Sequence, residues 1–384
     1  YTIKETLDTG EYYWGSSTIW YPYLNASGNW AMNITKGNGH ITISNLTIQN
    51  CWSAGGSDIS LYKTATIDNY GNLEVDNVNF IKNCAGVGAG IRNNANATVI
   101  VRNSMFDGNR KSSSTGNYGA GLYNNGTATI INSTFQNNLA RWGTVTSDKN
   151  LTIINSTIRD NIGYDGGSTY KTGSGITINT GSTNFYAIGS IGGINTVIDG
   201  CTFINNDQLD VSADMGNLNL TNNLFNRSTG VVVPSSSAGE NLKVKYYISN
   251  NTFISPIGSS LYNSLSSTDN VTLALRLSGQ YNYTITNNKV VDLRGTNSKA
   301  IELSANHAVI KNNTVDRKIS INGDYNTITD NNVTSTLDLY AVDLIAGYSS
   351  LGHNTVVNNY LVTGGFKGNA AVNYTQLSNN ISNN

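Results

Sequence analysis

The stretch Val101-Arg102-Asn103-Ser104-Met105-Phe106 is one copy of a six-residue block that recurs along the whole chain. The block reads apolar, any residue, asparagine, usually polar, any residue, apolar, and we call its third residue the anchor. Twelve copies have their anchors at Asn45, Asn77, Asn103, Asn132, Asn155, Gly200, Asn222, Asn250, Asn287, Asn312, Asp330 and Asn358. The residue two before the anchor is aliphatic in every copy. The residue three after it is always apolar, and this position holds six of the eight phenylalanines.

Repetition at a period of roughly 20 to 30 residues is typical of solenoids, in which each unit buries its apolar face only by stacking on its neighbours. The blocks have period-two alternation and many β-branched residues, and no stretch shows a sustained helical pattern, so the repeating unit is built from strands. Because strand crossovers are right-handed in nearly all cases, the sequence predicts an all-β fold: a right-handed single-stranded parallel β-helix of about a dozen or more coils.

The anchor position indicates a sharp bend between two short strands. Asparagine adopts the left-handed backbone region more readily than other non-glycine residues, and Gly200 meets the same requirement. Equivalent residues of successive coils should then lie one above another. We therefore expect aromatic columns and a hydrogen-bonded ladder of anchor side chains. The columns should contain Phe80, Phe106 and Phe135 in one group and Phe203, Phe225 and Phe253 in another.

The block is missing from residues 1–40, which are instead rich in aromatic side chains. We interpret them as an N-terminal cap over the end of a β-helix that spans residues 41–384. The alternative is a carbohydrate-stacking platform made by Trp14, Trp20, Tyr21, Tyr23 and Trp30. At the other end, residues 377–381 begin to resemble a further repeat. We therefore expect the protein to continue, or to be anchored, beyond Asn384.

Two glycine-containing segments add a resemblance to known proteins. They are Gly88-Ala89-Gly90-Ile91-Arg92-Asn93-Asn94 and Gly119-Ala120-Gly121-Leu122-Tyr123-Asn124-Asn125-Gly126, each followed by an apolar strand and then Asn-Ser-x-Phe. With the repeat, this pattern resembles the pectate-lyase-like β-helix superfamily, and more narrowly the adhesin-like surface proteins of methanogenic archaea and certain bacterial polymorphic outer-membrane proteins. The resemblance covers residues 41–384 and implies the fold specifically, but it implies function only weakly, because β-helices carry both enzymes and adhesins.

Composition bears on partners and compartment. The formal net charge is −1 and 12% of the residues are charged. Binding of nucleic acid needs a basic stripe that this sequence lacks, so we exclude that partner. The chain has no apolar run of 18 residues, so we expect no transmembrane segment in it. The expected partners are glycans or a partner cell surface, together with copies of the chain itself. We expect an extracellular, cell-surface glycoprotein.

Asn-x-Ser/Thr sequons are abundant, as chance dictates in a chain rich in asparagine and threonine. Asn25, Asn96, Asn125 and Asn270 lie in turn-like stretches and are our candidate N-glycosylation sites. A second group of sequons coincides with anchors. We expect these to point inward, where no glycan fits: Asn45, Asn132, Asn155, Asn250 and Asn312.

The cysteines allow two interpretations. Cys51 and Cys84 follow the first two anchors by six and seven residues, which should bring them close together on adjacent coils. They form either a disulfide or two small buried apolar side chains. Cys201 has no apparent partner, and no CxxC pair indicates a zinc site.

Catalysis on this fold would need carboxylates clustered on one groove. The densest acidic group is Asp199, Asp207, Asp210 and Asp214. These four are the catalytic candidates if the chain is an enzyme, and the last three would form a calcium site. A solvated turn is the simpler interpretation, so we assign no cofactor. The three histidines each lie five residues before an anchor, in a polar turn position, and we interpret them as structural.

The sequence therefore favours a non-enzymatic function: an extracellular adhesin-like β-helix that attaches to glycans, cells or surfaces. A polysaccharide lyase or glycoside hydrolase on the same fold is the alternative. A structural subunit of a cell-envelope layer or fibre is a third interpretation, which sequence does not separate from adhesion.

Overall fold

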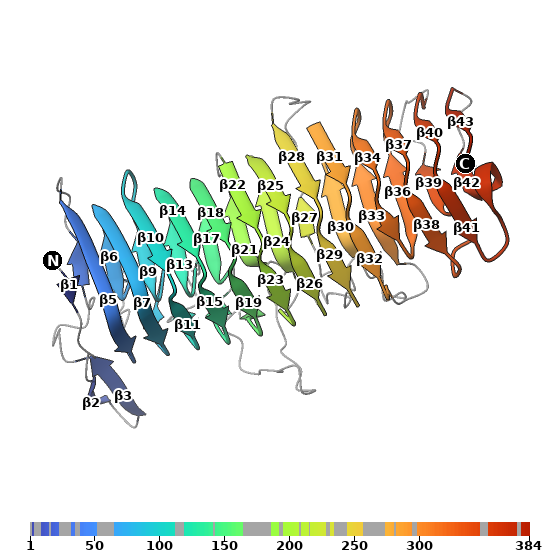
Figure 1. Ribbon diagram of the computed structural model, residues 1–384. Coiled ribbons are helices and arrows are strands. Elements are labelled where there is room, and N and C mark those ends of the chain that lie inside the picture. Colours follow the sequence, from blue (N-terminus) through green and yellow to red (C-terminus); the bar gives the residue numbers. More distant parts are fainter. Residues whose placement is uncertain are drawn as a thin grey trace. The chain divides into compact units, whose positions relative to one another are not determined.

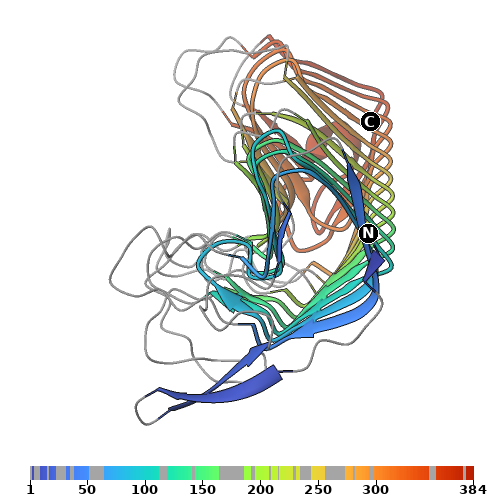
Figure 2. The same cartoon turned by 90° about the vertical axis from the view of Figure 1, so that its left-hand side faces the viewer.

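The structure is a computed structural model of all 384 residues. It describes residues 2–3, 9–14, 17–22, 32–34, 39–51, 65–111, 119–140, 143–163, 186–191, 195–206, 209–214, 216–227, 231–233, 244–255, 273–279, 282–293, 298–345, 352–374 and 378–384. The chain divides into two compact units, residues 1–194 with 205–207 and residues 195–204 with 208–384. Both units are parallel β-helices, and the coils wind in the predicted right-handed sense (Figures 1 and 2).

In unit 1, two parallel sheets form most of the wall of the solenoid, and the blocks lie in the longer one. The long sheet contains β1 (Thr2–Ile3), β5 (His40–Gln49), β7 (Asn72–Ile81), β10 (Thr98–Arg102), β11 (Met105–Asp107), β14 (Thr127–Ile131), β15 (Thr134–Gln136), β18 (Asn150–Ile154) and β19 (Thr157–Arg159). The second sheet contains β4 (Met32–Ile34), β6 (Ile67–Asn69), β9 (Ile91–Asn93), β13 (Leu122–Asn124), β17 (Val145–Ser147) and β21 (Tyr186–Ile191). A third, short sheet contains β8 (Cys84–Ala85), β12 (Arg110–Lys111), β16 (Leu139–Ala140) and β20 (Ile162–Gly163).

The N-terminal 40 residues contain strands that belong to the coils of the solenoid and a separate antiparallel pair of strands. β2 (Thr9–Trp14) and β3 (Ser17–Pro22) pair with each other antiparallel. However, β1 pairs in parallel with β5, and β4 pairs in parallel with β6. Strands of the solenoid are therefore present before residue 41.

Unit 2 repeats the two-sheet arrangement. Its long sheet contains β22 (Asn195–Asp199), β23 (Thr202–Ile204), β25 (Asn217–Thr221), β26 (Leu224–Asn226), β28 (Lys245–Ser249), β29 (Thr252–Ile254), β31 (Asn282–Thr286), β32 (Lys289–Val291), β34 (Val309–Lys311), β35 (Thr314–Val315), β37 (Thr327–Thr329), β38 (Asn332–Ser335), β40 (Thr355–Val357), β41 (Tyr360–Thr363) and β43 (Asn380–Ser382). Its second sheet contains β24 (Leu209–Asp214), β27 (Val231–Val233), β30 (Leu273–Ser278), β33 (Lys299–Ser304), β36 (Lys318–Asn322), β39 (Val342–Ile345) and β42 (Val372–Tyr374). A 3-10 turn, η2 (Gly368–Ala371), precedes β42. Among the described residues, no helix is long and apolar enough to cross a bilayer.

The predicted columns are present in the interior. Phe80, Phe106 and Phe135 stack with ring centroids 4.5 and 4.4 Å apart. The other three block phenylalanines stack at 4.7 and 4.6 Å. These spacings equal the separation of neighbouring strands, so the parallel register itself holds the rings face to face.

The glycines of the segments 88–94 and 119–126 make room for the phenylalanine columns. A Cβ atom built on Gly90 would lie 2.7 Å from the ring of Phe106, and one built on Gly121 would lie 2.6 Å from the ring of Phe135. Gly88 and Gly119 have φ angles of +61° and +63°, a region that other residues enter at a cost. The Gly-Ala-Gly pattern therefore bends the chain and lets two phenylalanine rings lie directly on the backbone.

All twelve anchors have positive φ, from 48° to 65°, as the sequence predicts. Their direction was predicted wrongly. The eleven non-glycine side chains, including those of Asn45, Asn132 and Asn312, are exposed rather than turned inward. Some anchors do bond to each other at the surface; for example, Asn77 Nδ2 donates to Asn45 Oδ1 at 2.7 Å.

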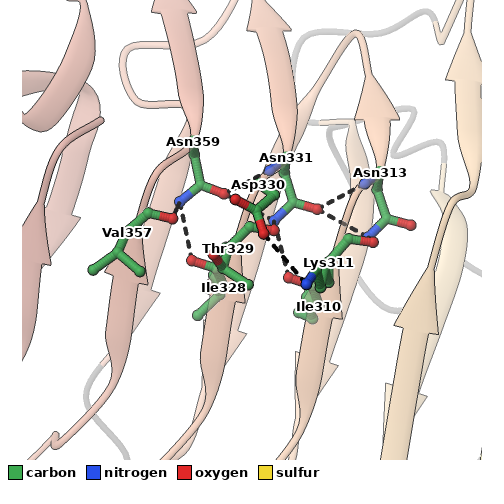
Figure 3. Close-up of polar contacts among 9 residues, drawn as sticks. All are labelled: Ile310, Lys311, Asn313, Ile328, Thr329, Asp330, Asn331, Val357 and Asn359. Carbon is green, nitrogen blue, oxygen red and sulfur yellow. Dashed lines mark hydrogen bonds and ion pairs between the residues drawn. The ribbon is translucent and has the colours of Figure 1, made fainter.

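The buried ladder of asparagine side chains is built by other residues. Each of them directly follows a residue with a left-handed (positive φ) backbone. In unit 2 the ladder follows the anchors and runs through Asn223, Asn251, Asn288, Asn313, Asn331 and Asn359. It ends at half-buried Asn384, which follows the left-handed Asn383. From Asn251 onward, each Oδ1 accepts the backbone N–H and the Nδ2 of the preceding asparagine at 2.9–3.1 Å (Figure 3). In unit 1 the ladder residues do not follow the anchors but the next left-handed bend of each coil. They are Asn83, Asn109, Asn138, Asn161 and Asn206.

Candidate functional site

Two of the four predicted catalytic acids, Asp199 and Asp210, have described side chains, and they lie on different sheets. Asp199 lies on β22 of the long sheet, where its Oδ1 accepts hydrogen bonds from Thr221 Oγ1 and Asn222 Nδ2, both at 2.6 Å. Asp210 lies on β24 of the second sheet and is fully buried. Asp207 and the side chain of Asp214 lie outside the described residues. Asp199 and Asp210 therefore belong to different sheets, and a catalytic group formed by the four acids stays a prediction.

No metal centre is evident in the described part of the chain. No group of three or more histidine, cysteine, aspartate or glutamate side chains in it is arranged to hold an ion. The calcium site proposed for Asp207, Asp210 and Asp214 stays a prediction, because only Asp210 has a described side chain.

Another described carboxylate, that of Glu74, is paired with basic side chains. Glu74 lies between His40 Nε2 at 3.0 Å and Arg102 Nε at 3.1 Å. The hydrogen bond from His40, with a smaller contribution from Arg102, lowers the pKa of Glu74 below its usual value. Glu74 is therefore ionised at neutral pH and is poorly suited to donate a proton as a general acid.

A second group of charged side chains lies on the second sheet of unit 2, at equivalent outward-facing positions of its strands. Glu302 is paired with Lys299 and lies 3.4 Å from Arg276 Nε. Asp343 lies two strands further along, beyond Ser320, and pairs with Lys318 at 4.0 Å. Its Oδ1 accepts a hydrogen bond from the side chain of Asn373 at 2.8 Å.

Cys51 and Cys84 lie on adjacent coils, as predicted, and the Cys84 backbone N–H donates to the Cys51 carbonyl at 2.7 Å. Both are buried free thiols, so the disulfide interpretation does not describe this structure. Burial raises the pKa of Cys51 to about 12. It raises the pKa of Cys84 to about 11, partly offset by Arg110.

These pKa values predict thiols that resist alkylation. At pH 8 a raised pKa leaves almost no thiolate, which is the reactive form, so native Cys51 and Cys84 should react with iodoacetamide about a hundredfold or more slower than unfolded chain. Mass spectrometry after timed labelling, in buffer and in denaturant without reductant, measures this. Fast native labelling would contradict the burial. Resistance of both residues in denaturant would reveal a disulfide instead.

The predicted N-terminal aromatic platform and glycosylation sites are only partly described. Trp14, Trp20 and Tyr21 lie in the β2–β3 hairpin, whereas Tyr23 and Trp30 lie outside the described residues. Asn25 and Asn270 also lie outside them. Asn96 is exposed in a turn with φ 63°, and Asn125 is half-buried.

Sequence analysis missed an apolar cluster on two described turns of unit 2. We call Leu337, Leu339, Tyr340 and Phe366 the aromatic corner. They lie on the turn after β38 and on the turn after β41, one coil further along. Leu337 and Leu339 are 74% and 62% exposed, and Phe366 is 36% exposed. The Tyr340 and Phe366 rings are parallel, with centroids 5.7 Å apart and planes at 3°.

The turn after β38, which carries Leu337, Leu339 and Tyr340, is fixed by a buried ion pair. Asp338 lies between the two exposed leucines but points inward, where its Oδ2 is 3.6 Å from Arg317 Nη1. The Ser335 hydroxyl donates to the same oxygen, and so does the Lys318 backbone N–H at 3.3 Å. Because separating a buried ion pair is strongly unfavourable, this turn is fixed in shape.

The second turn is held by Thr363. Its Oγ1 accepts the backbone N–H of Phe366 at 2.8 Å, and its own N–H donates to the Phe366 carbonyl at 2.9 Å. The two turns also touch, because a Cβ on Gly364 would lie 2.8 Å from the Thr336 carbonyl oxygen. The ring pair is therefore presented by two rigid turns.

The sequence signal for the aromatic corner is Leu337-Asp338-Leu339-Tyr340, an apolar stretch between two blocks where polar turn residues are expected. Its side chains belong to no column of the repeat. Its partner Phe366 is 26 residues away from Tyr340, so spacing alone did not connect them.

No protein-family model matches this sequence, and no curated protein sequence matches it. Two solved structures are similar, both of the tailspike protein of the E. coli bacteriophage HK620. A double mutant shares 12% identity, over 86% of this chain and 61% of that one, with a TM-score of 0.41. A single mutant in complex with a pentasaccharide shares 13% identity, over 88% of this chain and 60% of that one, with a TM-score of 0.36. This chain spans less than two thirds of either tailspike chain.

Proposed function

We propose that this protein is an extracellular, adhesin-like β-helix that attaches to glycans through the aromatic corner. The observation that carries the proposal is the parallel ring pair of half-buried Tyr340 and exposed Phe366, flanked by the exposed side chains of Leu337 and Leu339. Exposed apolar clusters on a soluble protein mark interaction sites, and flat rings suit the apolar faces of sugars. Since both turns are fixed before binding, little conformational entropy is lost on association.

The charge of the chain supports a carbohydrate ligand more than a strongly charged polymer. With 23 basic and 24 acidic residues, the protein has no net field that would recruit such a polymer. One corner would bind weakly. Many copies on a cell surface would act together, because each bound corner raises the effective concentration of the next.

Retention on a panel of immobilised neutral and acidic polysaccharides tests the proposal. Tyr340→Ala or Phe366→Ala should weaken retention about tenfold or more, because each removes one ring of the pair. Tyr247→Ala is the matched control, since Tyr247 is a 43% exposed tyrosine elsewhere in unit 2. Thermal unfolding must show that the variants are folded. Equal retention of Tyr340→Ala and wild type, or no retention of wild type on any glycan, would refute the proposal.

Glycoside hydrolysis at Glu302 and Asp343 is the second candidate. The two carboxylates lie two strands apart on one outward file, which corresponds to roughly 9.6 Å. Inverting glycosidases separate their two carboxylates by about 6.5–9.5 Å, so this strand spacing lies at the upper limit of that range. The same polysaccharide panel, analysed for released oligosaccharides, distinguishes the candidates. Cleavage that Glu302→Gln or Asp343→Asn abolishes would establish the hydrolase.

A further inference from the structure

The exposed anchors change the interpretation of the sequons that coincide with them. Asn132, Asn155 and Asn312 each stand at a left-handed bend with the side chain exposed to solvent. Each is the first residue of an Asn-x-Thr triplet, ending in Thr134, Thr157 and Thr314. The buried asparagine ladders of both units are built by other residues, so the amides of these three anchors are not needed inside the solenoid.

The amide groups of these three anchors also make no hydrogen bond to any other described residue. Two further anchor sequons differ. Asn250 Nδ2 donates to Asn222 Oδ1 at 2.6 Å, and Asn45 Oδ1 accepts from Asn77 at 2.7 Å. The sequon residue Asn373 lies within β42, where its Nδ2 donates to Asp343. Asn132, Asn155 and Asn312 can therefore be modified without breaking a contact of the fold.

We propose that Asn132, Asn155 and Asn312 are N-glycosylation acceptors. The proposal rests on the proposed extracellular function, since the reaction needs an exported chain and a lipid-phosphate-linked glycan as donor. The Asn Nδ2 forms a bond to C1 of the sugar, the bond from C1 to the phosphate oxygen breaks, the lipid phosphate leaves with the electron pair, and the amide loses one proton.

The geometry of the coils limits how many glycans fit. Asn132 and Asn155 are anchors of adjacent coils, with Thr134 paired to Thr157, so they lie about 4.8 Å apart. Two branched glycans cannot start side by side at that distance without crowding. One of the two sites is therefore glycosylated in any one molecule.

Secretion from a host with N-glycosylation machinery tests the proposal, because cells retain molecules that fail to fold. Occupancy is measured by peptide-N-glycosidase release in ¹⁸O water and peptide mapping. It is compared between the secreted and the retained fractions. Asn132 or Asn155, together with Asn312, should be occupied in the secreted protein, whereas occupancy at Asn373 should be depleted there about fivefold or more. Asn132→Asp should remove its signal and raise that of Asn155, because Asp330 shows that aspartate fits an anchor.

Absence of glycan at all three sites in the secreted protein would overturn the proposal. So would equal depletion of these sites and Asn373 in the secreted fraction. Peptide mapping of protein from the cells that produce it naturally, after surface labelling, separates this failure from failure of the proposed function. Surface-labelled protein without glycan at these anchors would refute the inference alone. Protein that is never labelled would refute the extracellular function as well.

Discussion

Replacing Asn331 by leucine is expected to destabilise unit 2 by about 4 kcal/mol, because leucine has the same shape but can form none of the five hydrogen bonds of the asparagine side chain. Asn331 Nδ2 donates to the Ile310 and Thr329 carbonyls and to Asn359 Oδ1, at 2.9–3.0 Å (Figure 3). Its Oδ1 accepts the backbone N–H and the Nδ2 of Asn313. Four of these five hydrogen bonds are buried, so their partner groups would be left unpaired without gaining water.

The measurement is hydrogen exchange combined with urea unfolding. In a solenoid each coil contacts only its neighbours, so the loss should centre on the coils around Asn331. The Asn313 amide donates to the deleted oxygen, and its protection should fall by about a thousandfold if the full effect is local.

The matched control is Asn312→Asp at the neighbouring anchor. Asn312 is exposed, outside the ladder, and aspartate occupies the same position one coil later at Asp330. We expect a change below about 1 kcal/mol. An unchanged Asn313 amide in the Asn331 variant, or equal effects of the two substitutions, would show that the ladder does not stabilise the coils.

The same pair of residues shows what the sequence could and could not reveal. The bend at Asn312 was predictable because a left-handed backbone has a residue preference. Which of two adjacent asparagines turns inward was not predictable from Asn312-Asn313, since both are the same residue type. The assignment depends on the left-handed residue turning its own side chain outward and the next one inward, which only the three-dimensional bend determines.

The interior columns were predictable for a different reason. Phe80, Phe106 and Phe135 recur at one position of a repeat, and parallel pairing places equal positions above one another. The aromatic corner has no such repetition. Tyr340 and Phe366 belong to turns of different length, and they meet because Asp338 and Thr363 fix those turns. Contacts that arise from tertiary constraints on single turns carry no periodic signal.

Phe106→Ala should destabilise unit 1 by about 4 kcal/mol, within the range measured for removing a buried phenylalanine ring. Phe106 is fully buried and is the middle ring of its column, so its loss removes two stacking contacts at once. The surroundings cannot collapse into the space. The ring rests on the backbone of Gly90, which has no side chain to move, and the strands above and below are held in register by their hydrogen bonds.

Urea unfolding followed by far-UV circular dichroism measures the effect, and Met105→Ala is the control. Met105 precedes Phe106 in β11 and faces outward, half-buried, so its truncation should cost less than about 1 kcal/mol. Phe106→Leu should fall between the two, because leucine refills part of the volume but stacks with neither neighbouring ring. Similar losses in the free energy of unfolding for Met105→Ala and Phe106→Ala would mean that the phenylalanine column does not stabilise unit 1. The order alanine, leucine, phenylalanine at position 106 would mean instead that the continuous aromatic file stabilises the coils of this unit, as the recurrence of phenylalanine at one block position implies.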